Sequence, residues 1–180
     1  MNGNVHAAYG LVSMAGLILE YQTSFEVCGV KIIPVIAICS VAAGSYAPDV
    51  DLARSHAGNK HKITSKVVST VGGGHRGWVT HSLLVPAILA ATIFVLSTTL
   101  AQYGAILQVA LSLLFGFGFG WVAHVWLDLF NGKGCPILWP LSTSKISIMD
   151  LPSTGKIPWA FIVLHTILIG VLWGLKHGLI

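Results

Sequence analysis

The stretch 105–128 limits what this chain can fold into more than any other part of the sequence. Its only Lys, Arg, Asp or Glu is the last residue, Asp128, and it exceeds the roughly 20 residues that a membrane-spanning helix needs. In a helix, Gly116, Gly120, His124 and Asp128 recur every four residues and share one face. Glycines on such a face let a second helix approach closely. Ionisable groups where that helix leaves the lipid are costly, so this pair marks a functional site.

The composition extends this prediction to the whole chain. Only 9% of the 180 residues are charged and 54% are hydrophobic, whereas a soluble domain carries about 25% charged residues. We expect five membrane-spanning helices, at 7–19, 31–47, 81–101, 105–127 and 158–180. Because these leave little room for a separate soluble module, the sequence predicts one all-α, polytopic membrane domain over residues 1–180. No Lys or Arg precedes Lys31, so we expect the first segment to be retained rather than cleaved as a secretory signal.

Charge sets the expected orientation. With five spans, the N-terminus and both long polar loops, 48–80 and 129–157, lie on one side, and those loops hold eight of the ten Lys and Arg. The positive-inside rule places that side in the cytoplasm. The basic residues are interspersed with Gly, Ser and Thr, which favours attraction to anionic lipid headgroups or a phosphate substrate over nucleic acid.

Histidines and aspartates gather on the same side. The candidate metal ligands are His6, Asp49, Asp51, His75, His81, His124 and Asp128. Imidazole and carboxylate without cysteine suit catalytic zinc, manganese or iron. The set exceeds what one ion needs, so we expect two divalent ions, most simply zinc, bridged by an aspartate. For Asp49 and Asp51, which repel each other unless a cation holds them, the alternative is a helix cap after residue 47.

Other polar residues are candidates for substrate binding. Arg76 lies between two of the histidines and is placed to bind a phosphate bidentately; alternatively, it is one more positive-inside charge. Ser55 and Lys145 are further substrate candidates. His165 lies inside the last expected span, and we expect it to be a hydrogen-bonding histidine rather than a metal ligand.

A four-part pattern carries a family resemblance. It consists of His6, Gly44-x3-Pro-Asp-x-Asp-x3-Ser55, His-Arg-Gly-x2-Thr-His-Ser82 and His124-x3-Asp128. Together these resemble the bacterial inner-membrane family described as metal-dependent hydrolases, one member of which is described as LexA-binding. That family is distantly similar to zinc-dependent phospholipase C and P1 nuclease. The resemblance implies phosphoester hydrolysis at the inner membrane, with His and Asp holding the metal.

These observations define three hypotheses. The first is a membrane-bound hydrolase of a phosphoester in a phospholipid or lipid-linked substrate, because a headgroup can reach such a site without leaving the bilayer. Asp49 or Asp51 would bridge the ions or accept the proton of the attacking water, and Arg76 would bind phosphate. The second is a non-enzymatic membrane interaction protein with a structural metal and a protein partner. The third, a metal transporter, is disfavoured because transport sites lie near mid-membrane.

Overall fold

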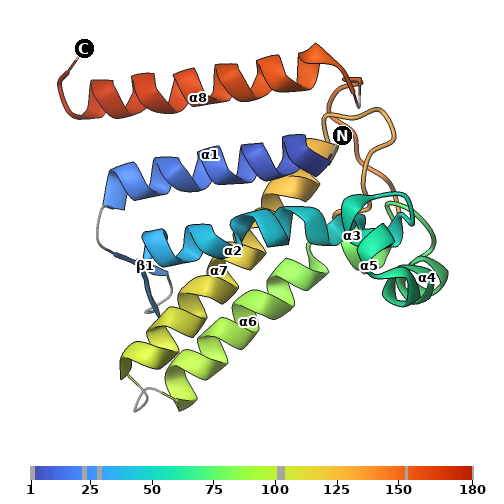
Figure 1. Ribbon diagram of the computed structural model, residues 1–180, viewed down its shortest axis with the longest axis horizontal. Helices are drawn as coiled ribbons and strands as arrows, with labels where there is room; N and C mark the ends of the chain where they lie inside the picture. The colour runs from blue at the N-terminus through green and yellow to red at the C-terminus, as the bar shows by residue number, and fades with distance from the viewer. Residues whose placement is uncertain (1–2, 22–23, 28–29, 101–103, 153, 180) are drawn as a thin grey trace.

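The computed structural model describes residues 3–21, 24–27, 30–100, 104–152 and 154–179. This part of the chain is mostly helical, as the sequence predicted (Figure 1). In chain order the elements are α1 (Gly3–Tyr21), β1 (Phe25–Val27), β2 (Val30–Ile32), α2 (Pro34–Tyr46), η1 (Ala47–Asp51), α3 (His56–Lys60), α4 (Lys62–Val71), α5 (Trp78–His81), α6 (Leu84–Thr99), α7 (Gly104–Asp128) and α8 (Lys156–Lys176).

The longer helices alternate in direction. The start of α1, the end of α2, the start of α6, the end of α7 and the start of α8 therefore lie at one end of the molecule, beside the short helices α3, α4 and α5 (Figure 1). The β1–β2 hairpin and the C-terminus lie toward the other end. The most extensive helix contact is between α2 and α7, and α1 and α6 pack around this pair. α8 packs on α1.

Glycine allows α2 and α7 to touch backbone to backbone. A Cβ atom added at Gly116 would lie 1.9 Å from the carbonyl oxygen of Ala37, and one at Gly120 would lie 2.1 Å from that of Val41. From the other side, Gly44 of α2 presses equally closely on the backbone of α7. This confirms the prediction that the glycine face of α7 admits a second helix.

Hydroxyl groups reinforce the same contact. The Ser40 hydroxyl donates to the carbonyl oxygen of Leu113 at 2.6 Å, and the Ser45 hydroxyl donates to that of Gly120 at 3.3 Å. Hydrogen bonds from small polar side chains across a helix contact are typical of helices packed in an apolar medium. They fix how far α2 can slide or rotate against α7.

Two of the described helices, α7 and α8, are each long and apolar enough to cross a bilayer. α6 is apolar but shorter, and α2 has only 13 residues. The expectation of five crossings stays a prediction.

The region 48–80 was expected to be a loop and instead folds into η1, α3, α4 and α5. A local reason is visible at Ser55, whose hydroxyl oxygen accepts the backbone N–H of Gly58 and so caps α3. The third expected span is also divided. His81 ends the short α5, Ser82 is extended, and α6 begins at Leu84.

We predict that Gly116→Ala destabilises the protein by about 1–3 kcal/mol, because the new methyl group collides with backbone that cannot rotate away. The matched control is Gly118→Ala on the same helix, where the added Cβ would meet only the Leu89 side chain at an ordinary 3.6 Å. Thermal unfolding in detergent should show a clear fall in Tm for the first variant alone. Equal Tm values for the two would contradict a backbone contact at Gly116.

Candidate metal centre

All of the predicted ligands come together at the end of the molecule where the helix ends meet (Figure 1). His6 lies near the start of α1, and Asp49 and Asp51 lie in η1. His81 ends α5, and the last turns of α7 supply His124 and Asp128. His75 lies in the loop between α4 and α5.

Three buried imidazoles face the Asp128 carboxylate. The Nε2 atoms of His6 and His81 each lie 3.4 Å from one of its oxygens, and that of His124 lies 3.7 Å away. None of these Nε2 atoms has a hydrogen-bond partner among the described residues. Ligands bound at about 2.0–2.2 Å to one tetrahedral zinc ion are themselves about 3.3 Å apart. The spacing therefore fits a shared cation better than direct hydrogen bonds, which are closer to about 2.9 Å.

The tautomer of His124 suits metal binding. Its Nδ1 lies 2.7 Å from the carbonyl oxygen of Ser45. A carbonyl oxygen only accepts, so Nδ1 carries the proton and Nε2 presents its lone pair toward Asp128.

A short relay gives His81 the same tautomer. The Thr80 hydroxyl lies 2.6 Å from Oδ2 of Asp51, to which it donates, and 2.8 Å from Nδ1 of His81. Because its single proton is given to the carboxylate, the Thr80 oxygen accepts the Nδ1 proton of His81. Nε2 of His81, 3.4 Å from an oxygen of Asp128, is then the ring nitrogen that is available to a cation.

Asp51 organises this side of the centre. Its carboxylate faces Nδ1 of His75 at 2.9 Å and accepts the backbone N–H of Arg76 at 3.0 Å. Burial alone would raise the pKa of Asp51, but hydrogen bonds from His75, His81 and Thr80 hold that pKa well below its usual range. Arg76 has a positive φ of 57°, an uncommon backbone conformation for a residue with a side chain.

The pKa of His81 reflects the two aspartates beside it. Burial lowers this pKa, but the Asp128 and Asp51 carboxylates together raise it above the usual value. A bound cation would replace a proton on His81, so metal uptake at this centre is linked to proton release.

The possible ligands form three overlapping groups. They are His6, His124 and Asp128; Asp49, His81 and His124; and Asp49, Asp51 and His75. Within each group the ligand atoms lie within 4.8 Å of one another. Asp49 and His124 each belong to two of the groups; of the two, only the carboxylate has two oxygens and could offer one to each of two ions. The His75 side chain is 32% exposed, so the third group opens toward the surface.

Arg76 contacts Asp128. Its Nη2 donates to Oδ1 of Asp128 at 2.8 Å and its Nη1 to Oδ1 of Asn131 at 3.1 Å, and the side chain is buried. The guanidinium thus helps to neutralise a carboxylate that faces the imidazoles. Arg76 also lines a small pocket of about 140 Å³.

The other two substrate candidates lie in different places. Lys145 lines the same small pocket as Arg76, beside the stacked rings of Trp78 and Trp139, whose centroids are 3.9 Å apart. Ser55 caps α3, and its hydroxyl donates to the carbonyl oxygen of Asp49 at 2.6 Å. Ser55 therefore holds the backbone that carries Asp49.

Residue types alone did not single out three contributors. Thr80 relays between Asp51 and His81, the Ser45 carbonyl orients His124, and Asn131 binds Arg76. Thr80 could have been noticed because it directly precedes His81 in the pattern His-Arg-Gly-x2-Thr-His-Ser82. Asn131 could have been noticed because it follows Asp128 by three residues. A backbone carbonyl leaves no such signal. His165 hydrogen-bonds with Ser13, at 3.1 Å, and its ring lies tilted against that of Tyr9, with the centroids 4.6 Å apart.

No cysteine belongs to the three ligand groups formed by the described residues. Burial raises the pKa of the Cys135 thiol to about 12.

Comparison with known proteins points to one family. The family model described as "YdjM inner membrane protein" matches residues 1–179. The uncharacterized protein YvsG of Bacillus subtilis is 31% identical over 156 residues, covering 87% of this chain and 83% of YvsG. The inner membrane protein YdjM of Escherichia coli is 34% identical over 93 residues, which is 52% of this chain and 43% of that protein. No solved structure matches.

We predict that Asp128→Asn abolishes high-affinity metal binding, because it removes the charge that the three imidazoles face. Asp150→Asn is the control, since that carboxylate accepts a backbone N–H from Gly132 away from the histidines. Elemental analysis of purified protein should show bound metal in the wild type and the control and little in Asp128→Asn. Unchanged metal content would contradict the site.

We also predict that Thr80→Val lowers metal affinity 10- to 100-fold, the usual loss when a group that orients a ligand is removed. The change keeps the shape of the side chain and removes the relay to His81. Thr70→Val on α4 removes only an exposed hydroxyl bonded to its own helix. Competition with a chelating dye gives both affinities, and a Thr80→Val value within twofold of the control would rule out the relay.

Proposed function

The chain belongs to the YdjM inner membrane protein family, and from that premise we propose that it is a membrane-bound, metal-dependent phosphoester hydrolase. Its substrate is a phospholipid or lipid-linked phosphoester. The observation that carries this proposal is the set of three buried Nε2 atoms, without hydrogen-bond partners among the described residues, that face Asp128.

His6, His81, His124, Asp49 and Asp128 would hold the principal ion, and Asp49, Asp51 and His75 would hold a second. Imidazole with carboxylate favours zinc, while manganese and iron are compatible with the same ligands. A metal in such a site supplies Lewis acidity toward a phosphoryl oxygen and activates water as the nucleophile.

Asp49 is better suited than Asp51 to receive the proton of the attacking water. The Asp51 carboxylate already accepts from the Thr80 hydroxyl and the Arg76 backbone N–H. The Asp49 side chain is 10% exposed, against 1% for Asp51. A base must reach the reacting water, and the Asp49 side chain is the more exposed of the two.

The pocket beside Arg76 and Lys145 supports a phosphate-bearing substrate. Its lining includes the cationic side chains of Arg76 and Lys145, together with Gly72 and Gly73. Arg76 also donates to the proposed ligand Asp128, so the pocket adjoins the candidate metal centre. Its volume of about 140 Å³ suits a headgroup fragment and excludes a hydrocarbon tail.

In this proposal the five longer helices each enter the bilayer, and the metal centre faces the cytoplasm. The alternation of helix directions and the concentration of Lys and Arg in 48–80 and 129–157 support this orientation. The short α2 would cross with the help of η1 and its contact with α7.

One observation favours the second hypothesis, a structural metal in an interaction protein. The side chains of His6, His81 and His124 are fully buried, and Asp128 is only 1% exposed. Structural sites are closed in this way, whereas catalytic sites keep an open position. The exposure of His75 is what favours catalysis.

The decisive experiment uses the purified protein in nanodiscs of phosphatidylethanolamine and phosphatidylglycerol. We expect phosphoester hydrolysis that a chelator abolishes and added zinc restores. Asp49→Asn should retain metal at the principal site and lose turnover. Bound metal without turnover of any phosphoester would overturn the hydrolase and favour the structural hypothesis.

We predict that Lys145→Gln raises KM about tenfold with little change in kcat, because a charge-assisted hydrogen bond to phosphate contributes about 1.5–3 kcal/mol. Lys133→Gln serves as control, since its side chain does not line the pocket. Michaelis–Menten measurements on the same phospholipid decide the point. A loss of kcat alone, or equal effects in both variants, would speak against phosphate binding by Lys145.

A further inference from the structure

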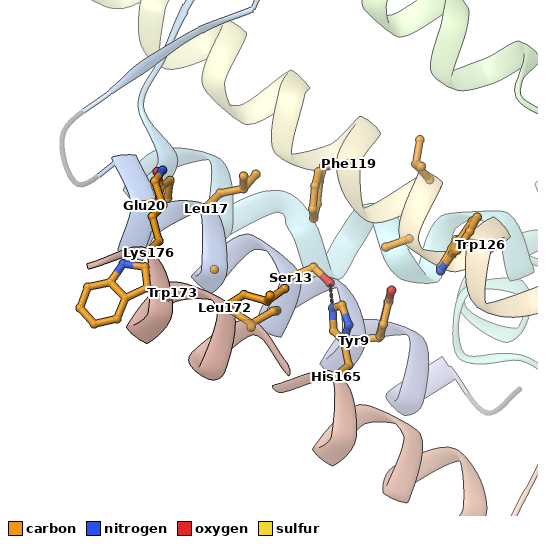
Figure 2. Close-up of a pocket in the computed structure, with 14 residues that line it drawn as sticks. Tyr9, Ser13, Leu17, Glu20, Phe119, Trp126, His165, Leu172, Trp173 and Lys176 are labelled. Carbon is orange, nitrogen blue, oxygen red and sulfur yellow. Dashed lines mark hydrogen bonds and ion pairs between the residues drawn. The ribbon is translucent and has the colours of Figure 1, made fainter. Parts of the chain in front are cut away.

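A second cavity, away from the metal centre, runs between α1, α7 and α8. It has a volume of about 540 Å³ and is lined chiefly by apolar side chains of the three helices (Figure 2). We call it the slot. Its walls include Leu17 of α1, Phe119 and Val122 of α7, and Leu172 of α8.

The slot is elongated. On α1 its lining extends from Tyr9 to Glu20, which is about 16 Å at the rise of an α-helix. Because the lining is chiefly apolar and runs along the helices of a membrane-family protein, the slot suits a hydrocarbon chain that lies parallel to them.

The two ends of the slot differ. At one end Ser13 and His165 are joined by a hydrogen bond, and the Tyr9 hydroxyl is directed toward Trp126 (Figure 2). At the other end Glu20 and Lys176 form an ion pair that leaves no net charge. Uncharged polar groups that can meet an ester or glycerol thus lie toward the Tyr9 end, whereas the other end carries a charged pair.

The Tyr9 end is also the end nearest the metal centre. Tyr9 follows His6 by one helical turn, and Ala123, which lines the slot, directly precedes His124. A lipid whose chain lies in the slot therefore has its polar part at the level of the proposed ligands. Water does not fill such an apolar space well, and close packing disfavours leaving it empty.

We propose that the slot binds one acyl chain of the lipid substrate and directs its headgroup to the metal centre. This inference rests on the proposed function, from which it takes the metal-bound headgroup, but the binding of a chain in the slot can be tested without turnover.

The first experiment uses the full protein in nanodiscs with phosphatidylglycerol that carries a diazirine in one acyl chain. After irradiation, peptide mapping should place adducts on Phe119, Val122 and Leu172 at least fivefold above those on Phe94 and Val95, which are exposed on α6. Even labelling of all exposed apolar residues would show ordinary surrounding lipid and overturn the proposal.

The second experiment blocks the slot. Leu172→Trp fills it, whereas Leu175→Trp places the same ring on α8 outside the lining, at a residue equally exposed. We expect Leu172→Trp to lose the slot adducts and to raise KM for the long-chain lipid about tenfold. Leu175→Trp should leave both the KM for the lipid and the turnover of p-nitrophenyl phosphate unchanged.

The two proposals fail in different ways. Adducts in the slot without turnover of any phosphoester would leave the chain-binding slot in place and overturn the hydrolase. Turnover with even labelling and equal KM values for Leu172→Trp and Leu175→Trp would keep the hydrolase and overturn the slot. The labelling of the wild type stands even if Leu172→Trp does not fold.

Discussion

The backbone contact between α2 and α7 is the constraint on which the rest of the structure depends. Gly44 and Gly120 bring the two helices within touching distance, and the next residue of α2, Ser45, then presents its carbonyl oxygen to His124. The packing of two helices thus fixes the proton position on an imidazole of the candidate metal centre. The same contact places the end of α2, and with it Asp49, beside the end of α7.

The candidate metal centre draws its ligands from α1, η1, α5 and α7. Arg76 donates to Asp128 and so places a positive charge beside that buried carboxylate. In the holo form that we propose, a divalent ion would add to the stability of the fold by joining these elements.

Much of this arrangement could be predicted from residue types and spacing. The four-residue repeat of Gly116, Gly120, His124 and Asp128 predicted both a packing face, which is confirmed, and two candidate ligands, which lie together in the structure. The break between α5 and α6 was not predicted because the mainly apolar sequence that starts at Leu83 follows His81 after one residue, with no Gly or Pro between them to mark a helix end. The relay through Thr80 and the carbonyl of Ser45 depends on backbone geometry, which no side-chain pattern records. The slot was invisible for a related reason: its apolar lining looks like any lipid-facing surface until three helices are placed together.

The order of the ligands along the chain has a consequence for biogenesis. Asp128 is synthesised 122 residues after His6. The centre that we propose therefore cannot assemble until α7 has been made, and loading of its ion would be a late step in the maturation of the protein.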